Sequence, residues 1–175
     1  MTKEDFKTCV LPVQPRLLRL AVTLLKNRAE AEDTVQDVCL KLWNIREKLH
    51  EYNSLEAFAI TITKNLCIDK LRSYRNRKQN EDGLENITIS ANRRHDPARA
   101  LELNESLQQV HNIISQLPEQ QRLILHLRDI EQYSYDEMEE MTGLTRNNIR
   151  VTLSRARKEV HKTYLKLHNY GNRKN

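Results

Sequence analysis

The residues with the clearest capacity for chemistry lie between Ser134 and Val160. Ser134 and Glu137 have the spacing of a capping box, in which each side chain satisfies a backbone N–H group of the other residue. Gly143 stands where a left-handed helix end is needed, and Thr145 can cap the helix that follows. This pattern predicts two short helices joined by a tight turn.

The second of these helices carries an unusual set of polar side chains. Its apolar residues Ile149, Leu153, Ala156 and Val160 recur every three or four positions and predict one buried stripe. Guanidinium and amide groups on the remaining faces suit the reading of guanine and adenine edges in a DNA major groove. The alternative is a solvated amphipathic helix that merely ends the domain. The polar set is Arg146, Asn147, Asn148, Arg150, Ser154, Arg155, Arg157 and Lys158.

Positive charge gathers in two separate segments of the 175-residue chain. Residues 59–78 and 146–175 are strongly basic, whereas the intervening residues 79–145 hold more acids than bases, so the net charge of +5 conceals both basic segments. Two basic segments predict two contacts with a polyanion such as nucleic acid. Membrane-surface binding is disfavoured because neither segment has the bulky apolar face that such helices use.

Enzyme chemistry finds little support in the sequence. The six histidines form no HxxxH or HExxH pair, and there is no glycine-rich phosphate loop. The acids near Asp33 and Asp37 fall in the first turns of a predicted helix, where the helix dipole favours negative charge. We therefore expect no catalytic residue, metal site, cofactor or small-molecule substrate.

The first half of the chain is predicted to be a helical bundle. We expect helical segments at 5–27, interrupted by Pro12 and Pro15, at 29–46 and at 55–78, with a loop at 47–54. In segment 29–46, Val35, Val38 and Leu42 form an inner stripe. The opposite face includes Leu40 among carboxylates, which indicates either a protein-binding surface or an isolated exposed leucine. In segment 55–78, the apolar residues that follow the helix begin with Phe58, Ile62 and Leu66.

The second half is predicted to be a smaller bundle. Residues 79–104 are polar and are interpreted as a linker. A helix is expected from near residue 98, within the end of this linker, to 116, and a second helix at 119–130 after the break at Leu117-Pro118. Leu125 falls outside the apolar stripe of the latter helix and predicts leftover apolar surface for a partner. We predict an all-α protein of two small helical bundles joined by a polar linker. The domains are 1–78, 79–104 and 105–175, the last containing the helix-turn-helix.

Cys9, Cys39 and Cys67 form an odd, widely spaced set without a CxxC pair, which favours reduced thiols in the cytosol over a disulfide framework. Residues 1–7 lack the apolar core of a signal peptide. No apolar run approaches the length of about 18 residues that suggests a membrane span, so we expect no direct membrane insertion.

Four segments, in order along the chain, resemble the extracytoplasmic-function (ECF) type of bacterial sigma factor in the sigma-70 family. Residues 31–43 (AEDTVQDVCLKLW) are similar to the family's conserved helix, and residues 58–72 to its promoter-melting helix. Residues 117–122 (LPEQQR) and 148–157 (NIRVTLSRAR) resemble its C-terminal domain. Small departures, such as Cys39 and Phe58 in place of larger aromatics, affect packing. Residues 48–54 match less closely, which leaves open the base they would read.

The resemblance implies a non-enzymatic cytoplasmic bacterial protein that binds core RNA polymerase and directs it to promoter DNA, often controlled by an anti-sigma factor. It implies polymerase contacts, with the clamp coiled coil and with the flap, at Asp33, Gln36, Asp37, Leu40, Lys41, Leu123 and Leu125. It implies minus-ten strand capture and backbone binding by His50, Tyr52, Asn53, Ser54, Asn65, Lys70, Arg72, Arg75 and Arg77. It implies minus-thirty-five duplex reading by Arg146, Asn147, Arg150, Ser154, Arg155 and Arg157.

A second hypothesis is a stand-alone helix-turn-helix transcription regulator whose N-terminal bundle senses a signal or dimerises. The basic segment 59–78 distinguishes the two hypotheses, because a sensing module has no need of it.

Overall fold

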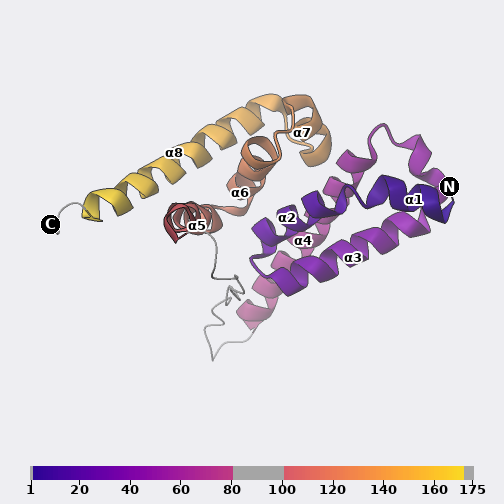
Figure 1. Cartoon of the computed structure of the whole chain (residues 1–175), viewed down its shortest axis with the longest axis horizontal. Coiled ribbons are helices and arrows are strands. Elements are labelled where there is room, and N and C mark those ends of the chain that lie inside the picture. Colours follow the sequence, from indigo (N-terminus) through magenta and orange to yellow (C-terminus); the bar gives the residue numbers. More distant parts are fainter. Residues whose placement is uncertain (1, 81–100, 172–175) are drawn as a thin grey trace. The chain divides into compact units, whose positions relative to one another are not determined.

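A computed structural model describes residues 2–80 and 101–171, and the regular elements in these ranges are all helical (Figure 1). The chain divides into two compact units. Unit 1 consists mainly of residues 2–80 and unit 2 mainly of residues 101–171. The sequence prediction of an all-α protein with two helical bundles is confirmed. Most of the expected linker, residues 81–100, lies outside the described residues.

Unit 1 is built from α1 (Lys3–Val10), α2 (Gln14–Leu25), α3 (Arg28–Asn44), the 3-10 helix η1 (Arg46–Glu51) and α4 (Leu55–Asn80). Helices α2, α3 and α4 pack against one another (Figure 1). Pro15 lies in the first turn of α2, where the missing N–H group costs nothing. Leu17, Leu20 and Leu24 of α2 are fully buried, and burying each such side chain contributes about 1.5–3 kcal/mol.

Two features of unit 1 differ from the sequence prediction. The expected loop at 47–54 contains η1, anchored by buried Leu49. The inner face of α4 is formed by Ile60, Thr63 and Cys67, whereas the expected stripe through Phe58 is only half-buried. Thr63 can lie in the core because its hydroxyl donates to the Ala59 carbonyl at 2.8 Å, which satisfies the buried polar group.

Unit 2 is built from α5 (Leu101–Gln116), α6 (Glu119–Leu125), the π-helix η2 (His126–Ile130), α7 (Tyr135–Thr142) and α8 (Arg146–Gly171). Helix α8 packs against α5 and α6. The helix predicted at 119–130 changes from α-helical to π-helical hydrogen bonding after Leu125. Because a π-turn holds more residues than an α-turn, side chains beyond it no longer follow the α-helical stripe.

The turn between α7 and α8 has the predicted chemistry. The Ser134 Oγ accepts from the Glu137 N–H at 3.3 Å, and a Glu137 carboxylate oxygen accepts from the Ser134 N–H at 2.7 Å. Gly143 ends α7 with a φ of 71°. A Cβ built at Gly143 would meet no atom within 4 Å, so the backbone angle rather than crowding favours glycine.

Candidate nucleic-acid and polymerase interfaces

Helix α8 is oriented by its buried stripe and by two caps at its first turn. Ile149, Leu153 and Ala156 are buried, as the sequence predicts, and Val160 is half-buried. The Thr145 Oγ1 accepts from the Asn148 N–H at 3.3 Å. These contacts turn the opposite face of α8 to the surface. All six residues predicted to read duplex DNA are exposed: Arg146, Asn147, Arg150, Ser154, Arg155 and Arg157.

Two of these arginines contact acids that the sequence prediction did not link to them. Arg157 and Asp129 form a bidentate ion pair, in which Nε donates to Oδ2 at 3.0 Å and Nη2 donates to Oδ1 at 2.6 Å. This hydrogen-bonded ion pair raises the pKa of Arg157 above its already high ordinary value. Because both side chains are partly exposed, the pair contributes at most about 1 kcal/mol to stability.

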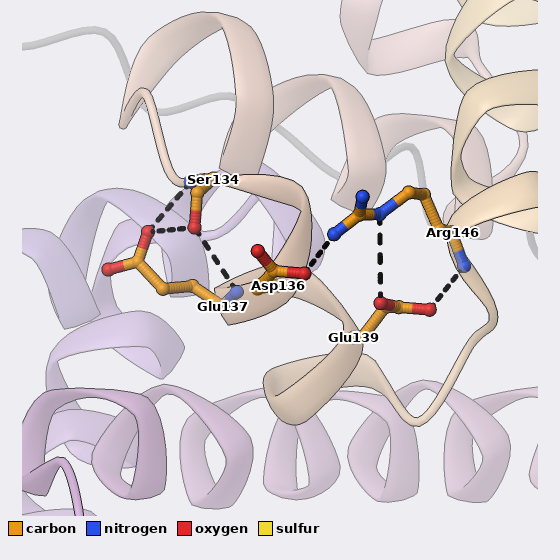
Figure 2. Close-up of polar contacts among 5 residues, drawn as sticks. All are labelled: Ser134, Asp136, Glu137, Glu139 and Arg146. Carbon is orange, nitrogen blue, oxygen red and sulfur yellow. Dashed lines mark hydrogen bonds and ion pairs between the residues drawn. The ribbon is translucent and has the colours of Figure 1, made fainter.

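Arg146 is held from α7, as Figure 2 shows. Its Nη2 pairs with Asp136, and its Nε lies 3.9 Å from a Glu139 carboxylate oxygen. The backbone N–H of Arg146 donates to the other Glu139 oxygen at 2.5 Å, so Glu139 also caps the start of α8. The first cation of α8 is thus fixed to the preceding helix by both its backbone and its side chain.

Arg155 lies in a different environment from Arg146 and Arg157. It lines a groove of about 550 Å³ between α8, the end of α5 and the start of α6, together with Lys158 and Lys162. The face of α8 is therefore not one uniform row of arginines. The groove-facing cations and the acid-bound cations are distinguishable sets within unit 2.

One exposed side chain on α8 was missed by the sequence analysis. Val151 follows Arg150 directly and is 40% exposed. An apolar group beside base-reading polar groups can contact the C5-methyl group of thymine in the major groove. The signal available in the sequence was the position of Val151 off the stripe that begins at Ile149.

In unit 1 the basic end of α4 is largely exposed. Arg72, Arg75 and Arg77 lie at the surface. The guanidinium of Arg77 stands 5.9 Å from the centre of the Tyr74 ring. Lys70 is half-buried, and its Nζ donates to the Thr34 Oγ1 on α3 at 2.9 Å. Lys70 thus links α4 to α3, whereas Arg72 and Arg77 contact residues of α4 itself.

The Tyr74 hydroxyl connects this basic end to α3. It donates to a Glu30 carboxylate oxygen at 2.6 Å. This hydrogen bond, with smaller contributions from burial and from the Glu30 charge, raises the pKa of Tyr74. Through this hydrogen bond Tyr74 holds α4 against the start of α3.

The segment proposed to capture an unpaired base surrounds the start of α4. His50, Tyr52 and Asn53 are exposed. Ser54 instead caps α4, because its Oγ accepts from the Ala57 N–H at 3.1 Å. The Tyr52 ring stacks on Phe58, with centroids 3.9 Å apart and planes inclined by 22°. Asn65, the remaining predicted residue, is exposed further along α4.

The outer face of α3 matches its predicted exposure. Asp33, Gln36, Asp37 and Lys41 are exposed, and Leu40 is 61% exposed among them. The inner face packs through buried residues such as Val38 and Leu42. An exposed leucine surrounded by acids and amides is suited to binding another protein, since the polar rim keeps the free surface soluble.

The expectation of leftover apolar surface at Leu123 and Leu125 is wrong. Both side chains are only 5% exposed. Six consecutive residues, 122–127, are buried, so the helix is enclosed on all sides rather than along one stripe. Buried Arg122 also connects α6 to α5, because its Nη1 donates to the Ser115 carbonyl at 2.9 Å.

Within the described ranges, no group of three or more histidines, cysteines or acids could hold a metal ion. The three cysteines are free, with Cys9 exposed and Cys67 buried. No single described helix is long and apolar enough to cross a membrane. The pair α1 and α2, bent by 52°, passes the same test on length and composition, although the leucines of α2 are core residues of unit 1.

The comparisons with known proteins agree with this division into units. Residues 9–77 match the family described as Sigma-70 region 2, and residues 107–160 match Sigma-70, region 4. The probable RNA polymerase sigma factor RfaY of Xanthomonas campestris pv. campestris is 30% identical over 160 residues, which are 90% of this chain but 40% of that protein. RNA polymerase sigma factor SigV of Bacillus subtilis is 27% identical over 157 residues, covering 90% of this chain and 89% of SigV.

A solved structure extends the likeness to the fold. The sigma factor RpoE from Bartonella quintana, crystallised with the anti-sigma factor NepR, matches with a TM-score of 0.77 and 28% identity, over 93% of this chain and 98% of that chain. The chain belongs to the sigma-70 family of RNA polymerase sigma factors and, within it, to the ECF type. It directs RNA polymerase to promoter-specific transcription initiation and is not an enzyme. The hypothesis of a stand-alone regulator is set aside, because residues 9–77 match region 2.

Proposed function

We propose that the two units divide promoter recognition between them, with unit 2 reading duplex DNA and unit 1 capturing an opened strand. The observation that carries this proposal is that clusters of exposed arginines lie on α4 in unit 1 and on α8 in unit 2, outside the packed faces of both helices. Phosphate contacts made by such cations supply affinity, and base contacts supply specificity.

In unit 2, the exposed face of α8 reads the minus-thirty-five element in the major groove. Arg150 and Asn147 provide the donors and acceptors that distinguish guanine and adenine, and Val151 adds an apolar contact for thymine. The capped first turn supports this role, because Thr145 and Glu139 fix the end of α8 that would enter the groove.

In unit 1, the exposed residues around the start of α4 capture an unstacked base of the minus-ten element. The Tyr52–Phe58 pair offers an aromatic surface on which a base can stack. Arg72, Arg75 and Arg77 then hold the phosphate backbone beyond it. Lys70 takes a lesser part, because its ammonium is already bonded to Thr34.

The outer face of α3 binds core RNA polymerase at the clamp coiled coil. Leu40 forms the apolar centre of this face, and Asp33, Gln36, Asp37 and Lys41 form its polar rim. The contact with the polymerase flap has no assigned residue, since Leu123 and Leu125 are core residues.

A run-off transcription assay with core polymerase tests the proposal. The purified chain should give promoter-dependent transcripts from a genomic promoter library, and core polymerase alone should not. Leu40→Asp should abolish transcription and co-elution with core polymerase, because a charge replaces the apolar centre of the α3 face. Val22→Asp is the matched control: Val22 is 37% exposed and lies on α2. Equal losses from both variants would contradict a polymerase contact on α3.

We also propose that the protein acts in the bacterial cytoplasm and is held inactive by an anti-sigma factor. The RpoE relative was crystallised with the anti-sigma factor NepR, which supports this proposal by analogy. The tagged chain can be purified by affinity from its own cells, with and without stress. We expect mainly an inhibitor from unstressed cells and mainly polymerase subunits from stressed cells.

A further inference from the structure

Arg146 stands apart from the other α8 residues proposed to read DNA, because two acids of α7 hold it from separate directions (Figure 2). Asp136 and Glu139 are three residues apart and therefore lie on the same side of α7. The Asp136 carboxylate accepts from the Nη2 of Arg146. Glu139 lies near the Nε of Arg146 and accepts a hydrogen bond from the backbone N–H of Arg146. The Nη1 group has no protein partner among the described residues and remains available to a ligand.

The contact lies at the surface rather than in the core. The Arg146 side chain is 50% exposed and that of Asp136 is 78% exposed. Ion pairs this exposed contribute little to stability. The Ser134–Glu137 capping box already fixes the start of α7 without using Asp136. A role in the folding of unit 2 therefore does not explain why an acid stands at position 136.

We propose that Asp136 and Glu139 are positioning residues that determine the specificity of Arg146. This proposal rests on the proposed function of α8 as the duplex reader. A free arginine is attracted to any phosphate, whereas Arg146 must give up or share a carboxylate to bind one. The carboxylates also repel nearby phosphates. Both effects weaken binding to unrelated sequences.

A guanine edge is a better partner for an arginine held in this way. The guanidinium has five donors in a rigid fork, so it can keep one carboxylate while its remaining N–H groups meet the O6 and N7 acceptors of guanine. Asp136 and Glu139 fix the plane of that fork before DNA arrives. The two acids thus lower indiscriminate affinity and retain affinity for one base pair.

The test is a selection with holoenzyme assembled from core polymerase and the full chain. Duplexes randomised over about 15 base pairs are bound, recovered and sequenced, giving the base preference at each position and the amount of DNA retained. The variants are Asp136→Asn, Asp136→Glu, Glu139→Gln, Arg146→Ala and Arg150→Ala. The matched control is Glu140→Gln, which removes the same charge from an exposed position of α7 that contacts no cation among the described residues.

Arg146→Ala should flatten the preference at one or two adjacent positions. Asp136→Asn should flatten the same positions by at least threefold and should raise retention of unrelated duplexes by about three- to eightfold, roughly the effect of one more phosphate contact. Glu140→Gln should leave every base preference unchanged. Asp136→Glu should restore the preference at those positions, because it returns a carboxylate to the arginine. Thermal unfolding should show Asp136→Asn folded as the wild type is.

The outcomes separate the inference from the function on which it rests. If Asp136→Asn behaves like Glu140→Gln, the inference is overturned and α8 remains the reader. If Arg150→Ala changes base preference but Arg146→Ala does not, the inference is overturned as well. If neither arginine variant changes any preference, the proposed duplex reading by α8 fails first.

Discussion

The two helices proposed to bind DNA, α4 and α8, hold their cations in different ways. On α8, Arg146 and Arg157 bind acids from other segments of unit 2, with short and directional contacts. On α4, Arg72 lies 3.9 Å from Asp69 of the same helix, and Arg77 lies over the Tyr74 ring. Fixed guanidinium groups suit the reading of base edges, whereas loosely held ones suit a backbone that offers phosphates everywhere.

The largest expected effect tests whether the two units are independent in folding. Ile149→Ala empties a fully buried site under α8 and should lower the stability of unit 2 by about 2–5 kcal/mol. The only tryptophan, Trp43, packs against Phe6 and Arg46 within unit 1. Its fluorescence transition should stay unchanged while the far-ultraviolet circular dichroism transition moves to lower temperature.

The matched variant for that experiment is Leu20→Ala, which empties a fully buried site in unit 1. It should shift the Trp43 transition by a similar amount. If Ile149→Ala also shifted the Trp43 transition, the two units would unfold as one, and comparing α4 with α8 as separate parts would lose its basis.

A smaller effect tests the base-reading role of α8. Arg150→Ala should cost about 1–3 kcal/mol of discrimination at particular base pairs of the minus-thirty-five element. Competition binding of holoenzyme to duplexes carrying single base-pair changes measures this directly. A uniform loss across all duplexes would assign Arg150 to the backbone and remove the main difference between the two helices.

An alkaline titration of the cysteines tests a property that belongs to unit 1 and not to unit 2, because every cysteine lies in unit 1. Burial raises the pKa of the Cys67 thiol from 9.0 to about 12. Above pH 9 the unfolded chain loses a proton that the folded chain keeps, so the free energy of unfolding falls as pH rises. The expected slope is about 1.4 kcal/mol per pH unit, up to the folded pKa. Urea unfolding followed by Trp43 fluorescence between pH 8 and 10.5 measures it.

Two variants control for the other groups that titrate in this range. Cys67→Ala should remove this part of the slope, and Cys9→Ala, at an exposed position, should keep it. Equal slopes in both variants would show that the Cys67 thiol does not govern the alkaline loss of stability.

The smallest expected effect tests the anchoring role of α4. Arg77→Ala should weaken DNA binding to a similar extent for every sequence. It should also reduce the slope of log affinity against log salt by about 0.7–0.9, the contribution of one phosphate contact. Titrations of holoenzyme with promoter DNA at several salt concentrations give this slope. A sequence-dependent loss would place Arg77 among the base readers.

Much of the fold could be predicted because local chemistry decided it. Pro15, the Ser134–Glu137 pair and Gly143 mark helix ends through backbone effects that need no partner. The face of α4 could not be predicted in this way. Apolar residues occur on several of its sides, and packing against α2 and α3 selected the side with Ile60 and Cys67.

The candidate site shows the same division between local and tertiary information. The exposure of the α8 arginines followed from the stripe through Ile149 and Leu153. Their partners did not, since Asp129 and Arg157 are 28 residues apart in the chain. Leu125 was misassigned because residues 122–127 are buried on every side of the helix, whereas the prediction assumed a single buried stripe.

Gly143 has a consequence for chemical synthesis of this domain. Its positive φ lies in the half of conformational space that D-residues prefer. A D-alanine at residue 143 would therefore restrict the unfolded chain without straining the native turn, and would stabilise unit 2 by about 0.4–1 kcal/mol. An L-alanine at residue 143 would have open space around its Cβ but a strained φ, so comparing the two enantiomers isolates the effect of the backbone angle.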